Sequence, residues 1–267
     1  MYRFLLSRQW VILTLLALVL IPVMIELGFW QFHRHENRVA HNKRIEAAIT
    51  AAPVAVGELT SPGHAVADAE RYRRVTATGT YDDENQFVVR RRTNSDDQVG
   101  VHVLTPLVLD DGKVLLVNRG WIAADGPQTE LPRIPAPPGG EVTVTGRLMP
   151  DETTAKSGIK DLKGLPDGMV MLIGSAAMAE VLDRPVLGGF VELSAPAPDG
   201  GTPQLLSAPD HGSIGAHMAY AVQWWLFTAA VPVGWVILVR RELRDRAAAA
   251  AKESDTTPTG PPATATV

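Results

Sequence analysis

Two long apolar stretches, one near each end of the chain, dominate the pattern of hydrophobic and polar positions. Residues 218–239 contain no charged side chain. As a helix they would extend about 33 Å, close to the roughly 30 Å core of a bilayer. Residues 10–30 form the other stretch, with Trp10 and Trp30 at its ends. Tryptophan is enriched at both membrane–water interfaces, so these positions fit the two ends of a membrane span. The pattern predicts transmembrane helices at 10–30 and 217–239.

A secretory signal peptide is the alternative for the first stretch, because Arg3 and Arg8 precede it. The stretch is long for a signal peptide, no small-x-small cleavage site follows it, and large residues occupy much of 27–32. We therefore expect a retained membrane anchor.

Charge orients the second helix. A block of arginines follows it, and positively charged segments beside membrane helices stay in the cytoplasm. Two spans place both termini on one side, so we expect a two-pass plasma-membrane protein. The expected parts are a cytoplasmic N-terminus (1–9), an extracytoplasmic domain (31–213) and a cytoplasmic basic segment with a disordered tail (240–267). The arginines are Arg240, Arg241, Arg244 and Arg246.

Between the spans, short extended segments predict a β-rich domain. Residues 31–49 continue the first helix to a stop at Pro53, and Asp110-Asp111-Gly112 is a hairpin signal. One short helix is expected at 175–182, with Ser175 as its N-cap. The fold class is α+β: two transmembrane helices flank an extracytoplasmic, mainly antiparallel β domain with a short helix. The expected strands are 73–80, 86–91, 102–109, 113–118, 141–148 and 189–193.

Composition and motifs narrow the function. The net charge is −4 and no basic stripe occurs, so no nucleic-acid partner is expected. The absence of cysteine excludes disulfides, thiol catalysis and copper delivery by a cysteine pair. No nucleophile elbow, Walker loop, zincin helix or dinucleotide fingerprint occurs, so no enzyme is predicted. His33, His35 and His41 share no helix face, which argues against a metal site. Arg90-Arg91-Arg92 fits a solvated strand end better than an anion site.

The second apolar stretch begins with polar and aromatic residues. A helix surrounded by lipid would gain nothing from His, Tyr and Gln in its first two turns, and polar groups inside membranes usually face a partner helix, a cavity or a ligand. An interfacial girdle is the alternative, with His217 as the boundary residue. At about 100° per residue, one helix face carries His217, Tyr220, Ala221, Trp224, Thr228 and Trp235, with Gln223 on its border.

Four motifs, in order along the chain, resemble those of the Surfeit-locus family of cytochrome c oxidase assembly factors. The first contains Leu27, Gly28, Trp30, Gln31 and Arg34, and the second combines Tyr72-Arg73-Arg74-Val75 with residues 100–107. The third and most specific is Asn118-Arg119-Gly120-Trp121, and the fourth contains His217, Tyr220, Ala221, Gln223 and Trp224. Residues 153–171 depart from the family because they hold neither Asn nor Trp.

The resemblance implies a non-catalytic role in building the haem a-containing subunit of an oxidase, with haem a as a transient cofactor. Neutral imidazole is a common axial haem ligand. His217, Tyr220, Gln223 and Trp224 would then form the haem site, with Arg34 and Arg38 beside the propionates. The implied partners are the catalytic subunit of the oxidase, the enzymes of haem a synthesis and the lipid bilayer. Two alternatives stay open: a docking chaperone that never meets haem, and an outer-face membrane-tethered enzyme.

Overall fold

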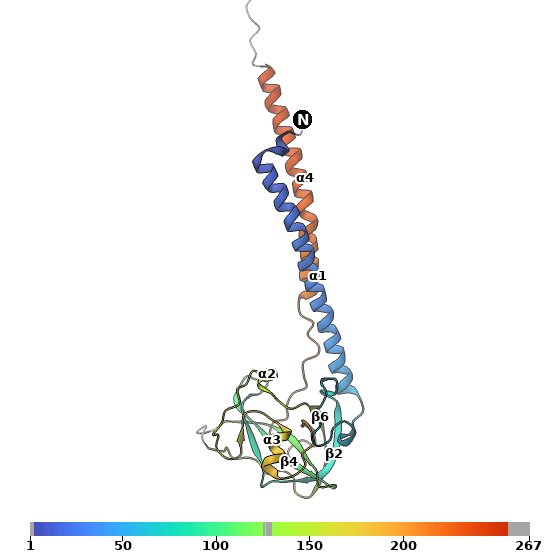
Figure 1. Ribbon diagram of the computed structural model, residues 1–267, viewed down its shortest axis with the longest axis vertical. Helices are drawn as coiled ribbons and strands as arrows, with labels where there is room; N and C mark the ends of the chain where they lie inside the picture. The colour runs from blue at the N-terminus through green and yellow to red at the C-terminus, as the bar shows by residue number, and fades with distance from the viewer. Residues whose placement is uncertain (1–2, 125, 127–129, 256–267) are drawn as a thin grey trace, which may run out of the picture. The chain divides into compact units, whose positions relative to one another are not determined.

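The computed structural model describes residues 3–124, 126 and 130–255, and the chain divides into two compact units. One unit combines residues 1–40 with residues 213–267, and the other is residues 41–212. The first holds a pair of long helices and the second a β domain with short helices (Figure 1). This confirms the predicted fold class.

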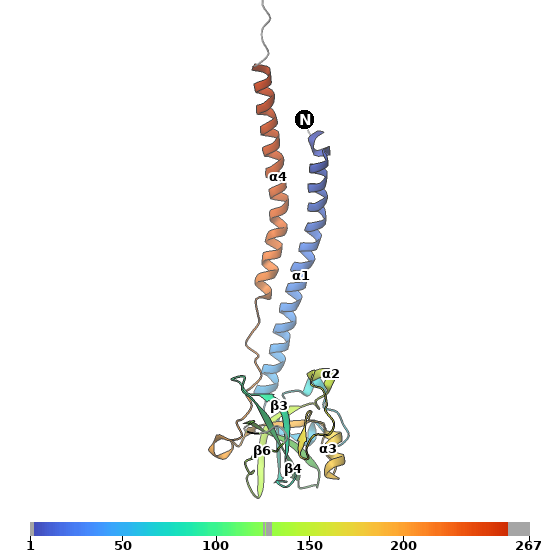
Figure 2. The same ribbon diagram turned by 90° about the vertical axis from the view of Figure 1, so that its left-hand side faces the viewer.

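The helix pair is formed by α1 (Arg8–Thr50) and α4 (His217–Asp255). They lie side by side and antiparallel in both views (Figures 1 and 2). Both are long and apolar enough to cross a membrane. A short 3-10 turn, Arg3–Leu6, precedes α1. As predicted, α1 continues beyond its apolar part and stops before Pro53.

The expectation of disorder directly after Arg246 is wrong for residues 247–255, which continue α4 as a helix. The physical reason is the run of alanines from Ala247 to Ala251, since alanine has the highest helix propensity of all residues. The rest of the predicted tail, residues 256–267, lies outside the described residues.

Five strands close into a barrel in the order β2-β6-β8-β5-β4, because β2 pairs with β4 as well as with β6. Neighbouring barrel strands are antiparallel except for β5 and β8. Outside the barrel, β1 pairs with β2, and β3 extends the sheet from β4 to β7. The strands are β1 (Val54–Ala55), β2 (Arg74–Tyr81), β3 (Phe87–Thr93), β4 (Val99–Leu109), β5 (Val114–Ala123), β6 (Glu141–Met149), β7 (Met169–Val170) and β8 (Phe190–Ala195).

The alternation of side chains explains the two faces of the barrel wall. Along β2, Val75, Ala77 and Tyr81 are buried in a cluster to which all five barrel strands contribute, so this cluster is the barrel interior. A second cluster, on the outer face, packs Leu104, Leu116 and Phe190 beneath Met178 of α3 (Ser175–Leu182). The remaining short helices are η2 (Val56–Glu58), η3 (Asp68–Glu70), α2 (Thr154–Ser157) and η4 (Asp199–Gly201).

The predicted helix at 175–182 is present, but its predicted cap is wrong. The N-cap residue is Gly174, and Ser175 is the first helical residue. Asp151 supplies the capping oxygens instead: it accepts hydrogen bonds from the Ser175 amide at 2.9 Å and from the Ser175 hydroxyl at 2.7 Å. A carboxylate is well suited to the positive end of a helix.

Closure of the barrel depends on a glycine. Gly79 stands between β4 and β6, opposite Leu109 and Val142, and a Cβ at this position would lie 2.3 Å from the Val108 carbonyl oxygen. We predict that Gly79→Val lowers the free energy of unfolding of the β domain by about 1–3 kcal/mol, as overpacking does. Thermal unfolding of the purified protein measures this. Gly57→Ala is the matched control, since a Cβ there would have no neighbour within 4 Å. Equal losses in both variants would contradict the prediction.

Candidate functional site

The two long helices meet along a seam with regular spacing. On each helix, one row among the shielded positions follows alternating steps of three and four residues, the spacing of a coiled-coil seam. On α1 these buried or half-buried positions are 10, 14, 17, 21, 24, 28, 31 and 35. On α4 they are 217, 221, 224, 228, 231 and 235.

The two helices approach each other closely at Gly28. A Cβ on this residue would lie 2.3 Å from Nε1 of Trp225, so the indole ring occupies the space that a side chain would need. Ala221, one turn before Trp225, is completely buried. Small residues allow membrane helices to pack closely. The sequence analysis missed Trp225, although its step of four from Ala221 was a signal for it.

His217, the first residue of α4, meets Gln31 of α1. The distance from His217 Nδ1 to Gln31 Oε1 is 3.0 Å. An amide oxygen only accepts hydrogen bonds, so the ring nitrogen that faces it carries a proton, and in the neutral imidazole Nε2 then has the lone pair. Gly215 has a φ of +67°, and a Cβ there would lie 3.6 Å from Nε2. The glycine therefore leaves room beside the nitrogen that has the free lone pair.

The other predicted residues of α4 divide between the seam and the outside. Trp224 and Thr228 lie on the seam, and Trp235 donates from Nε1 to the Thr14 hydroxyl at 3.1 Å. Tyr220 is 49% exposed and Gln223 is also exposed. Tyr220 lies about 60° from His217 around the helix, outside the contact with α1.

The two arginines predicted near this site are both engaged. The Arg34 guanidinium stacks 5.0 Å from the centre of the Trp30 ring. Arg38 Nε donates to the Ser213 carbonyl oxygen at 3.0 Å, which holds the segment before α4 against α1. Between these arginines, His35 has a buried Nδ1 without a hydrogen-bond partner. The structure thus gathers Gln31, His35, Arg38 and His217 at one end of the seam.

The Asn-Arg-Gly-Trp motif lies in the interior of the β domain. Arg119 is only 2% exposed. Its Nη1 donates to Gln86 Oε1 at 3.1 Å and to the Pro135 carbonyl at 2.9 Å, and its Nη2 donates to the Ala136 carbonyl at 3.0 Å. Burial lowers the pKa of Arg119, and burial also raises the pKa of Tyr81, beneath the guanidinium, to about 12. Arg119 thus fastens the loop between β5 and β6 to the barrel.

The rest of the motif is equally enclosed. Trp121 is 7% exposed, and its Nε1 donates to the Arg92 carbonyl oxygen at 3.3 Å. Gly120 has a φ of +133°, and a Cβ there would lie 2.3 Å from the Gln204 carbonyl oxygen. Asn118 is 1% exposed. The motif therefore offers no exposed contact surface of its own.

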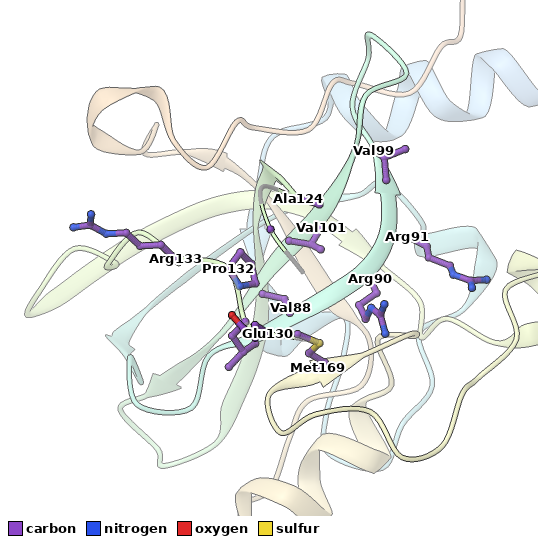
Figure 3. Close-up of a pocket in the computed structure, with 12 residues that line it drawn as sticks. Val88, Arg90, Arg91, Val99, Val101, Ala124, Glu130, Pro132, Arg133 and Met169 are labelled. Atoms are coloured by element: carbon purple, nitrogen blue, oxygen red, sulfur yellow. The ribbon is translucent and has the colours of Figure 1, made fainter. Parts of the chain in front are cut away.

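The run Arg90-Arg91-Arg92 is only partly a solvated strand end, which corrects the sequence analysis. Arg92 is buried and pairs with Glu152 at 2.6 Å. Arg90 and Arg91 line a pocket of about 160 Å³. Figure 3 shows Val88 and Val101 turned toward its centre while Arg91 points away. The described residues contain no group of three or more His, Asp or Glu side chains that could hold a metal ion.

The burial of Arg119 yields a stability prediction. Arg119→Met should lower the free energy of unfolding by roughly 3 kcal/mol, because the carbonyls of Pro135 and Ala136 lose their donor. Chemical denaturation of the purified protein measures this. Arg133→Met in the same loop is the control, since Arg133 is exposed and should give a change below about 0.5 kcal/mol. A stable, fully folded Arg119→Met variant would show that the side chain does not fasten the loop.

Comparison with known proteins extends the resemblance over most of the chain. The SURF1 family model matches residues 18–229. Uncharacterised SURF1-like proteins of Mycobacterium bovis and Mycobacterium tuberculosis are each 30% identical over 248 residues, which cover 91% of this chain and 88% of theirs. A SURF1-like protein of Rickettsia felis is 27% identical over 110 residues, 41% of this chain and 46% of that protein. With a family model that matches well over half of its length, the chain belongs to the SURF1 family.

Proposed function

We propose that this chain is a two-pass plasma-membrane assembly factor for a haem a-containing cytochrome c oxidase, and that His217 helps present haem a to the catalytic subunit. Membership of a family associated with oxidase assembly supports the first part. The hydrogen bond between His217 and Gln31 carries the second. On this proposal, the enzymes that synthesise haem a would supply the haem that His217 binds.

The residues at this end of the seam fit a haem. A ligating imidazole commonly donates its other N–H to a protein acceptor, which fixes the ring and raises its basicity, and Gln31 is placed to do this for His217. Trp224, and Tyr220 with its exposed ring, offer apolar surface on the same two turns. His35 Nδ1 is a buried polar atom that still lacks a partner. When bound, the haem would supply the iron centre that the oxidase needs.

The cations of α1 suit the polar edge of such a ligand. Guanidinium groups bind carboxylates through paired charge-assisted hydrogen bonds. Arg34 and Arg38 follow Gln31 on α1, and Arg38 uses its Nε for Ser213, which leaves its terminal nitrogens available to a propionate. Gln223 is exposed and would not contribute to the ring pocket in this arrangement.

A docking chaperone without haem is the second candidate, and the same hydrogen bond favours it. His217 and Gln31 satisfy each other, so the pair could serve only to lock the helices in register. The exposed aromatic and apolar residues of α4 would then contact an oxidase helix. Haem content of the purified protein separates the two candidates.

The orientation of the membrane helices generates a prediction. The arginines from Arg240 to Arg246 should hold the end of α4 in the cytoplasm, and a second span should return the N-terminus to the same side. Reporter fusions at Gly140 and at Val267 should therefore report opposite sides of the membrane. If both report one side, the two-pass arrangement is wrong.

Direct haem presentation makes a spectroscopic prediction. Protein purified from a strain that makes haem a should carry the haem a absorption band, and His217→Ala should lose it while keeping its abundance and membrane insertion. Gln31→Leu should weaken haem binding about 10–100-fold, as loss of a partner of a ligating His does. Tyr220→Phe should be nearly silent, because the ring remains.

His33→Ala is the matched control, since His33 is an exposed imidazole on the same helix that stacks on Phe29 instead of facing α4. Full haem occupancy in His217→Ala would eliminate ligation by this residue. If His217→Ala and Gln31→Leu instead lower the melting temperature equally and no preparation contains haem, the docking chaperone is the better account.

A further inference from the structure

A cavity of about 370 Å³ opens on the outer face of the barrel, within the size range of small-molecule sites. Its lining includes Asn118 and Glu192, which are register partners on β5 and β8. The neighbouring residues Val117 and Val191 point into the barrel interior, so Asn118 and Glu192 point outward. The next strand continues the polar row with Arg147, the register partner of Glu192 on β6.

His102 of β4 completes the row, and its hydrogen bonds define its protonation. The Gly120 amide donates to Asn118 Oδ1 at 3.2 Å, which identifies the oxygen of that carboxamide. The nitrogen, Nδ2, therefore donates to His102 Nδ1 at 3.1 Å. An imidazole nitrogen that accepts a hydrogen bond carries no proton, so the ring proton of neutral His102 is on Nε2.

This imidazole stays neutral under physiological conditions. Burial, and to a lesser extent the charge of Arg92, lowers the pKa of His102 to about 3. His102 Nε2–H is therefore a neutral donor over the whole physiological pH range. It has no protein acceptor in the part of the chain that the structure describes, although His102 lines the cavity. A ligand that reaches this nitrogen must offer an acceptor.

Nearly all charged groups that line the cavity are already satisfied. Glu192 accepts from Arg147 at 3.2 Å and Glu152 accepts from Arg92 at 2.6 Å. Asp151 accepts from the Ser175 amide and hydroxyl, and Lys156 pairs with Asp68 at 2.8 Å. Burial raises the pKa of Glu192, so a further negative charge next to this carboxylate would be unfavourable. Because each carboxylate in the lining already has a partner, these groups do not indicate a cationic ligand.

Arg71 is the exception. Its guanidinium lies 4.9 Å from the centre of the Tyr72 ring and has no close ion pair among the described residues, although its charge lowers the pKa of Asp68 and opposes the rise in the pKa of Glu192. The cavity thus offers one cation without a close ion pair at Arg71, one neutral donor at His102, and an apolar wall from Tyr72, Met149 and Phe190. An anionic group suits the arginine, a neutral acceptor suits the imidazole, and an apolar body suits the wall.

We propose that this cavity binds a carboxylic acid that also carries a carbonyl oxygen and a part-apolar body, the chemistry of an N-acyl amino acid or of the C-terminal residue of a polypeptide. The carboxylate pairs with Arg71 and the carbonyl oxygen accepts from His102 Nε2–H. The site is built from residues of the β domain alone and is independent of the proposed role of His217.

The test uses the full-length protein in detergent micelles, with N-acetyl-phenylalanine as probe and its uncharged carboxamide as control ligand. The acid should bind at least about tenfold more tightly than the amide, because a charge-assisted hydrogen bond is lost. Arg71→Gln should remove that difference. Arg71 is exposed, so this variant should fold normally, and Arg91→Gln, at an exposed arginine outside the cavity, should retain it.

Histidine-selective ¹⁵N labelling gives a second readout. The His102 resonances should show the Nε2–H form at neutral pH and should shift when the acid is added. Equal binding of acid and amide, unchanged binding in Arg71→Gln, or an Nδ1–H form at His102 would each overturn the proposal, as would the absence of any binding. A phenylalanine-terminated peptide that binds much more tightly than the free acid would identify a protein terminus as the source, and equal binding would identify a free acid.

Discussion

The close approach of the two long helices at Gly28 is the contact on which the arrangement of the membrane unit depends. The Trp225 ring fills the volume that any larger residue would need. Because rows of shielded residues on both helices share one spacing, fixing this contact fixes the others along the seam. Thr14 then meets Trp235 near one end, and Gln31 meets His217 near the other. The position of the His217 ring is therefore a consequence of a glycine one turn away on the partner helix.

A buried cation has the corresponding role in the β domain. A guanidinium is costly to remove from water unless its donors find acceptors, and Arg119 finds a carboxamide and two main-chain carbonyls. These acceptors belong to two separate segments, one just before β3 and one between β5 and β6. On either side of Arg119, Asn118 donates a hydrogen bond to His102, which lines the neighbouring cavity, and Gly120 allows the backbone of residue 204 to come close. A motif of four consecutive residues thus holds three different parts of the domain.

The sequence predicted the large features well because each depended on local information. The apolar stretches specified the two helices, and alternation along 74–81 or 141–149 specified strands. Features that depend on distant partners were not predictable in this way. The cap of α3 comes from Asp151, and β1 and β7 are two-residue strands that exist only through pairing. The alanines after Arg246 were read as low-complexity sequence, whereas their helix propensity decided the outcome.

The candidate site shows the same division. His217 was identified from its position at a membrane boundary, but its partner lies 186 residues away and nothing local pointed to it. The face drawn around His217 includes Tyr220, whose ring lies outside the contact with α1, so the wheel alone does not separate seam residues from exposed ones. The cavity beside His102 was not predicted, since its row of polar side chains comes from strands far apart in the chain.

The place of β8 in the barrel determines when the domain can become complete. This strand is the last of the five in the chain, yet it lies between β5 and β6. Until residues 190–195 have been synthesised, the earlier strands can form hairpins but cannot form a closed wall, and two edges with unpaired backbone groups remain open. A chain that ends prematurely before this point would not yield a smaller working domain. It would yield an open sheet with β5 and β6 as unpaired edges, available for pairing with other unfinished chains.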